Sequence, residues 1–285
     1  MPSFEVPNVD LSQYTMREMM APPMAVLVLA LAVLGAWVAF TGSPVALGIQ
    51  FTGGTELVVE TSASQAEIAE TFSQYDPSVR PIGTADQYLV TFQSTNQDAI
   101  RQQAVQAGYS IEQLQSSSAT FGQSTQRLAL IGVLAAFVGM SIVVFLLFRT
   151  AVPSLGVVIS AFSDIVVPVA LMDLLGIKLS LGTVAALLML IGYSVDSDIL
   201  LTNHVLRRSG GFWESVHRAM RTGVTMTVTS IVVMGVMATV AYIFGIQLLS
   251  DIGLVLVFGL ATDLMNTYMF NVNLLRWYKF EGVSR

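Results

Sequence analysis

The stretch GYSVDSDILLTNHVLRR, residues 192–208, places Asp196 and Asp198 at the end of a segment that is otherwise apolar. The whole segment, residues 181–203, is long enough to cross a bilayer, which takes about 20 apolar residues. A carboxylate at membrane depth costs about 2.5–3.5 kcal/mol on insertion scales, so it faces other helices or water and usually carries function. The fold and the function of this chain therefore depend on what surrounds these two side chains.

The composition of the whole chain is typical of an integral membrane protein. Of its 285 residues, 54% are hydrophobic and 11% are charged, whereas about 25% of the residues of a soluble domain are charged. The absence of cysteine excludes disulfides, thiolate nucleophiles and Cys-ligated metals, and two histidines leave little room for a histidine-built metal site. We therefore expect no metal and no cofactor. The net charge of −6 provides no basic patch for nucleic acid; this acidity suits a protein bathed in high salt or is compositional drift.

Five further segments have the apolar length of a membrane span, so we predict a polytopic α-helical membrane protein with six transmembrane helices. The first, residues 24–40, is entered through Pro22 and Pro23, which can begin a helix but not sit inside one. The others are residues 128–148, 152–175, 224–244 and 252–275. The predicted organisation is a cytoplasmic N-terminal segment at 1–23, a first transmembrane helix at 24–41, an outer domain at 48–121, a five-helix transmembrane domain at 128–276 and a cytoplasmic tail at 277–285.

The distribution of positive charge predicts which side of the membrane each loop faces. The opposite side of the membrane from the termini has Lys178 in a short loop, and the arginines of the long insert hardly count for topology. We therefore expect a multi-pass protein of the plasma membrane with both termini in the cytoplasm and the insert outside. The basic residues on the cytoplasmic side are Arg17, Arg149, Arg207, Arg208, Arg218, Arg221, Arg276, Lys279 and Arg285.

The insert between the first two spans is predicted to fold as a small domain. Ser64 and Glu67 form a capping box at the start of its first helix, and the order βαββαβ is that of a ferredoxin-like α+β domain. It contains no catalytic constellation, so we expect it to contact a partner, with a mere spacer as the alternative. The predicted strands are residues 56–61, 78–83, 87–93 and 109–115, and the predicted helices are residues 64–74 and 96–107.

Four aspartates stand well inside the predicted spans: Asp164, Asp196, Asp198 and Asp263. Asp173 and Asp251 lie near the outer ends of spans, where we expect a solvated carboxylate. A buried carboxylic acid can load and release a proton near neutral pH, and a group reached from each side in turn lets protons flow down their gradient. The alternative is that these carboxyl groups are static, protonated hydrogen-bond donors between helices.

The two acids of the fourth span point in different directions because they are two residues apart on a helix. Asp198 shares a stripe with Ser194 and Thr202, and Asp196 lines up with Gly192, a small residue that lets a neighbouring helix pack closely. We expect the fifth span to complete a polar interior seam among spans three to six. It offers Thr222, Thr225 and Thr229 on one face, with Arg221 at its cytoplasmic end.

Three stretches of the sequence, in order and within this topology, resemble the motifs of one family. GIQFTGGTE at 48–56 resembles GIDFTGGT, with Gln50 replacing the acid; IGYSVDSDILLTNHVLRR at 191–208 resembles a fourth-helix motif whose key acid falls at Asp196; and RAMRTGVTMTVTS at 218–230 resembles a fifth-helix entry whose arginine falls at Arg221. The chain is similar to the SecF family, the smaller half of the SecDF accessory of the protein-export translocon, in its archaeal form. The motif residues outside the first helix are Gly48, Gln50, Phe51, Gly53 and Gly54.

This resemblance implies a place in the resistance-nodulation-division superfamily, in which two six-helix halves pair about a pseudo-twofold axis. It also implies that the proton-motive force drives the outer domains to assist a polypeptide that leaves the translocon. The implied partners are SecD, the SecY translocon complex, the exported polypeptide and membrane lipid. The implied proton-relay residues are Asp196, Asp198, Arg221, Asp263 and Asp164.

Three other functions stay open at this point. One is a half-transporter of the same superfamily for lipid or small molecules; a self-contained exporter of that kind would normally need twelve spans in one chain, so six spans indicate a half-unit. Another is a passive scaffold that stabilises the translocon, which would need no protonation at all. An intramembrane aspartyl protease would use Asp196 and Asp263, but its Y-D, G-x-G-D and P-A-L motifs are missing. No nucleotide-binding loop exists, so energy has to come from a gradient or from a partner complex.

Overall fold

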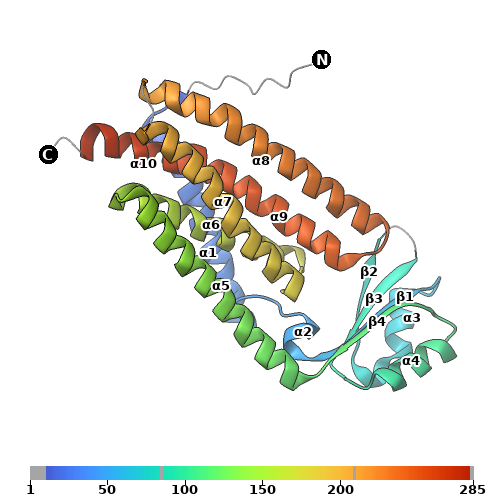
Figure 1. Ribbon diagram of the computed structural model, residues 1–285. Coiled ribbons are helices and arrows are strands. Elements are labelled where there is room, and N and C mark those ends of the chain that lie inside the picture. Colours follow the sequence, from blue (N-terminus) through green and yellow to red (C-terminus); the bar gives the residue numbers. More distant parts are fainter. Residues whose placement is uncertain (1–10, 84–85, 208–209, 283–285) are drawn as a thin grey trace, which may run out of the picture.

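The computed structural model describes residues 11–83, 86–207 and 210–282, and in them six helices are long and apolar enough to span a membrane. A small domain containing a sheet lies between the first and second of these helices, at one end of the helical part (Figure 1). The predicted fold class is therefore confirmed. Residues 1–10 and 283–285 of the predicted terminal segments lie outside the described residues, as does Arg208. The spanning helices are α1 (Met16–Thr41), α5 (Ala119–Phe148), α6 (Ala151–Leu175), α7 (Leu181–Arg207), α8 (Phe212–Ile243) and a sixth that runs through α9 (Gln247–Met265), η3 (Asn266–Asn271), α10 (Val272–Trp277) and η4 (Tyr278–Gly282).

Several helices begin well before the apolar segments that identified them. Helix α1 begins at Met16 because Thr15 and Glu18 form a capping box there, so Pro22 and Pro23 lie inside the helix rather than at its entry. This corrects the expectation for the two prolines, whose missing N–H groups leave two helical carbonyls unpaired. The side chain of Ser118 caps α5, which begins at Ala119, by accepting a bond from the Phe121 N–H. Hydropathy detects the part of a helix in the membrane, whereas caps decide where the helix starts.

Three of the helices form the core of the membrane domain. In the 18-residue apolar stretch of each spanning helix, the share of buried residues is 61% for α6, 50% for α7 and 50% for the sixth span. The corresponding shares are 11% for α1, 6% for α5 and 17% for α8. The sixth span also contacts α6, α7 and α8 extensively. The peripheral helices therefore have faces left for lipid or a partner, and polar groups on the core helices lie away from lipid.

The domain inserted between α1 and α5, which we call the outer domain after its predicted location, has the predicted ferredoxin-like fold. Its sheet has the antiparallel order β2-β3-β1-β4, with α3 (Gln65–Thr71) and α4 (Gln97–Gln106) on one face. Leu57, Val59 and Phe92 pack against these helices, while Val58 and Leu89 point to the other face, toward the membrane helices. The strands are β1 (Gly54–Glu60), β2 (Ser78–Ile82), β3 (Gln87–Phe92) and β4 (Ser110–Ser117), joined to α1 by the short helix α2 (Ile49–Thr52).

Candidate functional site

Three buried carboxylates meet where α6, α7 and α9 pack together. Asp164 is 1% exposed, Asp198 0% and Asp263 2%, and each comes from a different core helix. The sequence placed Asp164, Asp198 and Asp263 inside spans, and the structure brings these three into one cluster. We call Asp164, Asp198 and Asp263 the acid cluster.

Neutral hydroxyl and amide groups bind all three carboxylates of the acid cluster. Each carboxylate accepts at least one short bond, and Thr267 Oγ1 lies 2.9 Å from Asp198 Oδ1 and 3.3 Å from Asp263 Oδ1, which links two members. No lysine, arginine or histidine in the described part of the chain bonds to them. The other bonds are Ser194 Oγ to Asp164 Oδ2 at 2.6 Å, Asn266 Nδ2 to Asp164 Oδ1 at 2.7 Å, Asn271 Nδ2 to Asp198 Oδ1 at 2.6 Å, and Ser197 Oγ to Asp263 Oδ1 at 2.9 Å and to Asp263 Oδ2 at 3.0 Å.

The absence of a counterion among the described residues limits the charge that the acid cluster can carry. Ionising all three carboxyl groups would bury three negative charges against neutral partners, which is expensive in a low-dielectric interior. The second oxygen of Asp198, Oδ2, is buried and has no hydrogen-bond partner in the described part of the chain. A carboxyl group with a free oxygen among other carboxyl groups is suited to bind and release a proton. No group of His, Cys, Asp and Glu in the described ranges is arranged to hold a metal ion.

A π-helical segment supplies most of the neutral partners. Residues Asn266–Asn271 (η3) widen the sixth span directly after Asp263, and Asn266, Thr267 and Asn271 in it donate to the acid cluster. Such widened turns inside α-helices are frequent at functional sites. These three side chains are neutral, so charge within a predicted span does not identify them. The run NTYMFNVN at 266–273 was the available signal, because three asparagines in eight residues are unusual in a membrane span.

The structure separates Asp196 from the acid cluster. Asp196 is exposed and lines a groove of about 470 Å³ between α7 and α8, together with Ser197, Asn203 and Gly223. This corrects the expectation that Asp196 belongs to the interior seam, because the face of α7 that packs inward carries Asp198. Asp263 also lines the groove, so it connects the acid cluster to this surface.

Helix α8 contributes less to the seam than expected. Arg221, Thr225 and Thr229 are exposed, and the two threonine hydroxyls donate to carbonyls of their own helix. Thr222 is exposed as well. This corrects the prediction that Thr222, Thr225 and Thr229 complete the polar seam, whose carboxylates and their donors come from α6, α7 and the sixth span.

Two further expectations about α6, α7 and α9 differ from the structure. A Cβ atom at Gly192 would meet no described atom within 4 Å, so no described helix of this chain packs against that glycine. Asp173 and Asp251 are only 3% and 8% exposed, not solvated as expected. Asp173 accepts a bond from the Ala46 backbone N–H at 3.1 Å, and Asp251 accepts one from Gln247 at 2.6 Å.

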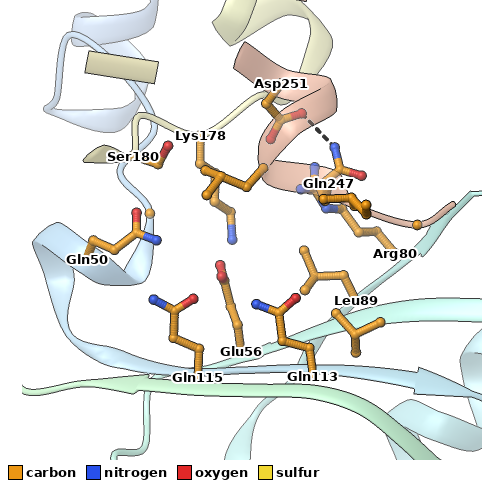
Figure 2. A pocket seen from close by; sticks show the side chains of 15 residues that line it. Gln50, Glu56, Arg80, Leu89, Gln113, Gln115, Lys178, Ser180, Gln247 and Asp251 are labelled. Carbon is orange, nitrogen blue, oxygen red and sulfur yellow. Dashed lines mark hydrogen bonds between the residues drawn. The ribbon is translucent and has the colours of Figure 1, made fainter. Parts of the chain in front are cut away.

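The glycine-rich motif at 48–54 connects the outer domain to the membrane helices. Gly53 and Gly54 have φ values of +78° and +124°, and a Cβ at Gly54 would lie 2.3 Å from the Phe92 carbonyl oxygen, so only glycine fits there. The Gly48 N–H donates to the Leu179 carbonyl at 2.8 Å. Of the two other motif residues, Phe51 is buried. The side chain of Gln50 lines a cavity between the sheet and the helices (Figure 2).

Comparison with known proteins identifies relatives along the whole chain. The family model described as protein export membrane protein SecD/SecF, C-terminal, matches residues 97–281. Proteins named protein-export membrane protein SecF are similar over the full length of both chains in Haloferax volcanii, at 60% identity, and in Haloquadratum walsbyi, at 58%. The SecF of Pyrococcus furiosus is 38% identical over 93% of each chain.

One solved structure shares the fold. The crystal structure of SecDF, a translocon-associated membrane protein from Thermus thermophilus, superposes with a TM-score of 0.72 at 19% sequence identity. The match covers 93% of this chain and 38% of the SecDF chain. At this identity the match supports the architecture of six helices with an inserted domain, and the chain spans well under half of the larger protein.

Proposed function

Because this chain belongs to the SecF family of protein-export membrane proteins, we propose that it is the SecF half of a SecDF complex that uses the proton-motive force to assist protein export. The proposed partners are SecD, the SecY translocon complex and the exported polypeptide, with lipid around the peripheral helices. The 38% coverage of the SecDF chain supports a half-unit that needs a second half. The family is one of export proteins and not of enzymes, so the protease alternative ends here.

The charge distribution supports the proposed orientation. Basic residues near the ends of the spans gather on one side, which in membrane proteins is the cytoplasmic side. In this proposal both termini therefore lie in the cytoplasm, and the outer domain faces the exterior of the cell. The outer domain is then placed where a polypeptide emerges from the translocon.

The observation that carries the proposal is the acid cluster. Three carboxyl groups in a protein interior, bound only to hydroxyl and amide groups of the described residues, have to share few charges, and adding or removing one proton changes the charge of the whole group. The Thr267 hydroxyl bridges Asp198 and Asp263, and Asp263 reaches the groove between α7 and α8. A proton that arrives from this groove therefore meets Asp263 first and Asp198 through Thr267.

The π-helical segment η3 gives the acid cluster a way to change the position of the helices. Asn266, Thr267 and Asn271 bind the carboxylates through the side chains of one distorted stretch of the sixth span. Ionised carboxylates bind N–H and O–H donors more strongly than neutral ones do. Loading a proton therefore loosens these bonds and lets the sixth span shift against α6 and α7.

We assign the polar residues that this chain leaves uncovered to contact with the SecD half. Asp196 is exposed at membrane depth, Gly192 has open space beside it, and both lie on α7. A carboxylate in lipid is expensive, whereas a small residue allows a second helix to pack closely. Arg221, exposed on α8, belongs to the proposed proton-handling set only through such a contact with the partner.

Two substitutions on different faces of α7 test the proposed function. In cells whose own SecF is deleted, we expect Asp198→Asn to reduce export of a secreted protein to the deletion level, because asparagine copies the protonated acid permanently. Asp196→Asn is the matched control on the same helix, and we expect it to reduce export less. Both chains must be present at normal abundance in the membrane.

The outcomes separate the alternatives. Normal export by Asp198→Asn at normal abundance would show that the chain is a passive scaffold. A loss in Asp196→Asn as large as in Asp198→Asn would move the proton-carrying group from the acid cluster to the groove.

A further inference from the structure

A second polar region lies between the outer domain and the membrane helices. It is a cavity of about 190 Å³, formed by the face of the sheet opposite α3 and α4 and by the outer ends of α7 and α9 (Figure 2). A water needs about 10–15 Å³ of such space, so the cavity has room for on the order of ten waters. We call it the junction cavity.

The charges that line the junction cavity come in complementary pairs. The outer domain contributes Glu56 from β1 and Arg80 from β2, and the membrane domain contributes Lys178 from the loop before α7 and Asp251 from the start of α9. In Figure 2 the ammonium group of Lys178 points toward the carboxylate of Glu56, and Arg80 lies beside Gln247, which donates to Asp251. Each domain therefore presents one positive and one negative charge to its opposite.

These charges act on each other without touching. Neither Glu56 with Lys178 nor Arg80 with Asp251 forms an ion pair; Lys178 Nζ donates to Thr91 Oγ1 at 3.4 Å, and Arg80 Nη1 to the Gly176 carbonyl at 3.2 Å. Burial raises the pKa of Glu56, and the charges of Lys178 and then Arg80 offset part of that rise. Burial lowers the pKa of Lys178, and Glu56 offsets part of that change. The pairs are therefore held apart across a gap that a small movement can close or widen.

The helices that carry the acid cluster lead directly to the junction cavity. Asp251 and Asp263 lie twelve positions apart on the unbroken helix α9, which corresponds to about 18 Å. Lys178 precedes the start of α7, which carries Asp198. A displacement of α7 at the acid cluster therefore moves Lys178 of the first charge pair, and a displacement of α9 moves Asp251 of the second.

Backbone contacts hold the two domains together around the junction cavity. The Leu179 N–H donates to the Ala46 carbonyl at 2.7 Å, beside the bond from Gly48 to Leu179. The turn between α8 and α9 lies against β3, since a Cβ at Gly245 would fall 2.1 Å from Gln87 Oε1. The outer domain thus rests on the loops that end the core helices.

A closely packed apolar layer separates the junction cavity from the acid cluster. Leu187, Leu190, Leu256 and Leu260 are at most 4% exposed and belong to one packed cluster, and along α7 and α9 they lie between the two polar regions. A Cβ at Gly259 would lie 2.2 Å from Leu190 Cδ1, so Leu190 fills the space that this glycine leaves. Because these side chains are apolar and closely packed, the two regions communicate through movement of helices.

We propose that the charge pairs Glu56–Lys178 and Arg80–Asp251 are the coupling contact through which the membrane helices move the outer domain. The inference rests on the proposed function, because it names the place where proton-driven motion leaves the membrane. Closing a pair pulls the sheet toward the helices, and widening it lets the outer domain rise.

A charge swap in the complete SecDF complex, reconstituted with the translocon in vesicles, tests the inference through two signals. Proton uptake is measured with a pH-sensitive dye inside the vesicles, and export by protection of a secreted substrate. We expect Glu56→Lys alone and Lys178→Glu alone to lower export about fivefold to tenfold, the size of coupling between residues that share a cavity, with proton uptake kept. The double variant, with both charges exchanged, should regain export to within about twofold.

The control is Glu60→Lys, an exposed position at the end of the same strand β1, which should leave both signals unchanged. Export at the wild-type level in both single variants would overturn the coupling contact, as would a double variant no better than the single ones. Absence of gradient-driven proton uptake in the wild-type complex would instead overturn the proposed function.

Discussion

The acid cluster and the junction cavity, which α7 and α9 connect, use opposite arrangements of charge. In the acid cluster three groups of one sign are packed without counterions from the described residues, and neutral donors contact each of them. In the junction cavity two acids and two bases face one another across space for water. The first arrangement makes the net charge depend on a proton, and the second makes the energy depend on distance. One is therefore suited to receive the proton and the other to respond to displacement.

Opening the apolar layer between the two regions should have the largest effect. Leu190 is 1% exposed, and we expect Leu190→Ala to lower the free energy of unfolding by about 2–5 kcal/mol, the cost of a large cavity in a core. The same change should let protons leak through the reconstituted complex, because water can then enter between Leu256 and Gly259. Thermal unfolding in detergent and passive acidification of vesicles measure the two effects.

The control for the apolar layer is Leu134→Ala on the peripheral helix α5, because the Leu134 side chain is 55% exposed on the surface of the helical domain. It should change stability little and cause no leak. If Leu190→Ala stays as tight to protons as Leu134→Ala, the layer does not separate the two regions.

A smaller effect on stability is expected from the ionisation of a single carboxyl group in the outer domain, that of Glu56. The pKa of Glu56 is raised by burial from its usual 4.5, so its proton-bound form is favoured in the folded protein and the charged form costs stability above that pH. Glu56→Gln should therefore raise the unfolding temperature at neutral pH and leave it unchanged well below pH 4.5, while export falls because a coupling charge is lost. Differential scanning calorimetry across pH measures the first result.

Glu67 provides the matched control of opposite sign. Hydrogen bonds from the Ser64 backbone N–H and side chain lower its pKa, so it stabilises the folded protein above its usual pKa of 4.5 and loses this contribution as the pH falls through the lowered value. Glu67→Gln should lower the unfolding temperature at neutral pH and leave export intact. If Glu56→Gln and Glu67→Gln shifted the unfolding temperature at neutral pH in the same direction, the proposed difference between the junction cavity and the capping box would be contradicted.

The sequence predicts the architecture well because hydropathy and periodicity report on it directly. Six apolar segments identify the spans, and the period-two alternation of Tyr88, Val90 and Phe92 identifies a strand, which in the structure is buried on both faces. The start of a helix is a different kind of information. Thr15 and Glu18 bind the first turn of α1 ahead of the apolar run, so the helix includes two prolines that hydropathy and proline rules place at its entry.

The acid cluster was only partly predictable. Asp164, Asp198 and Asp263 stand out as charges in apolar segments, but which face of α7 turns inward depends on how α6 and α9 pack, and Asp196 and Asp198 are equivalent until that packing is known. Asn271 and Thr267 lie in an asparagine-rich run that is unusual for a membrane span, but that run does not indicate the π-helical turn through which they act. Contacts between residues far apart in the sequence decide which face of α7 turns inward and which neutral side chains bind the carboxylates.

Infrared difference spectroscopy during a pH titration of the complex would show whether the acid cluster binds and releases a proton while Asp196 does not. We expect a carboxylic-acid band that appears and disappears within the pH range that supports export. This band should be missing in Asp198→Asn and kept in Asp196→Asn. A band that stays constant over that range, or one that disappears in Asp196→Asn instead, would contradict proton exchange by the acid cluster.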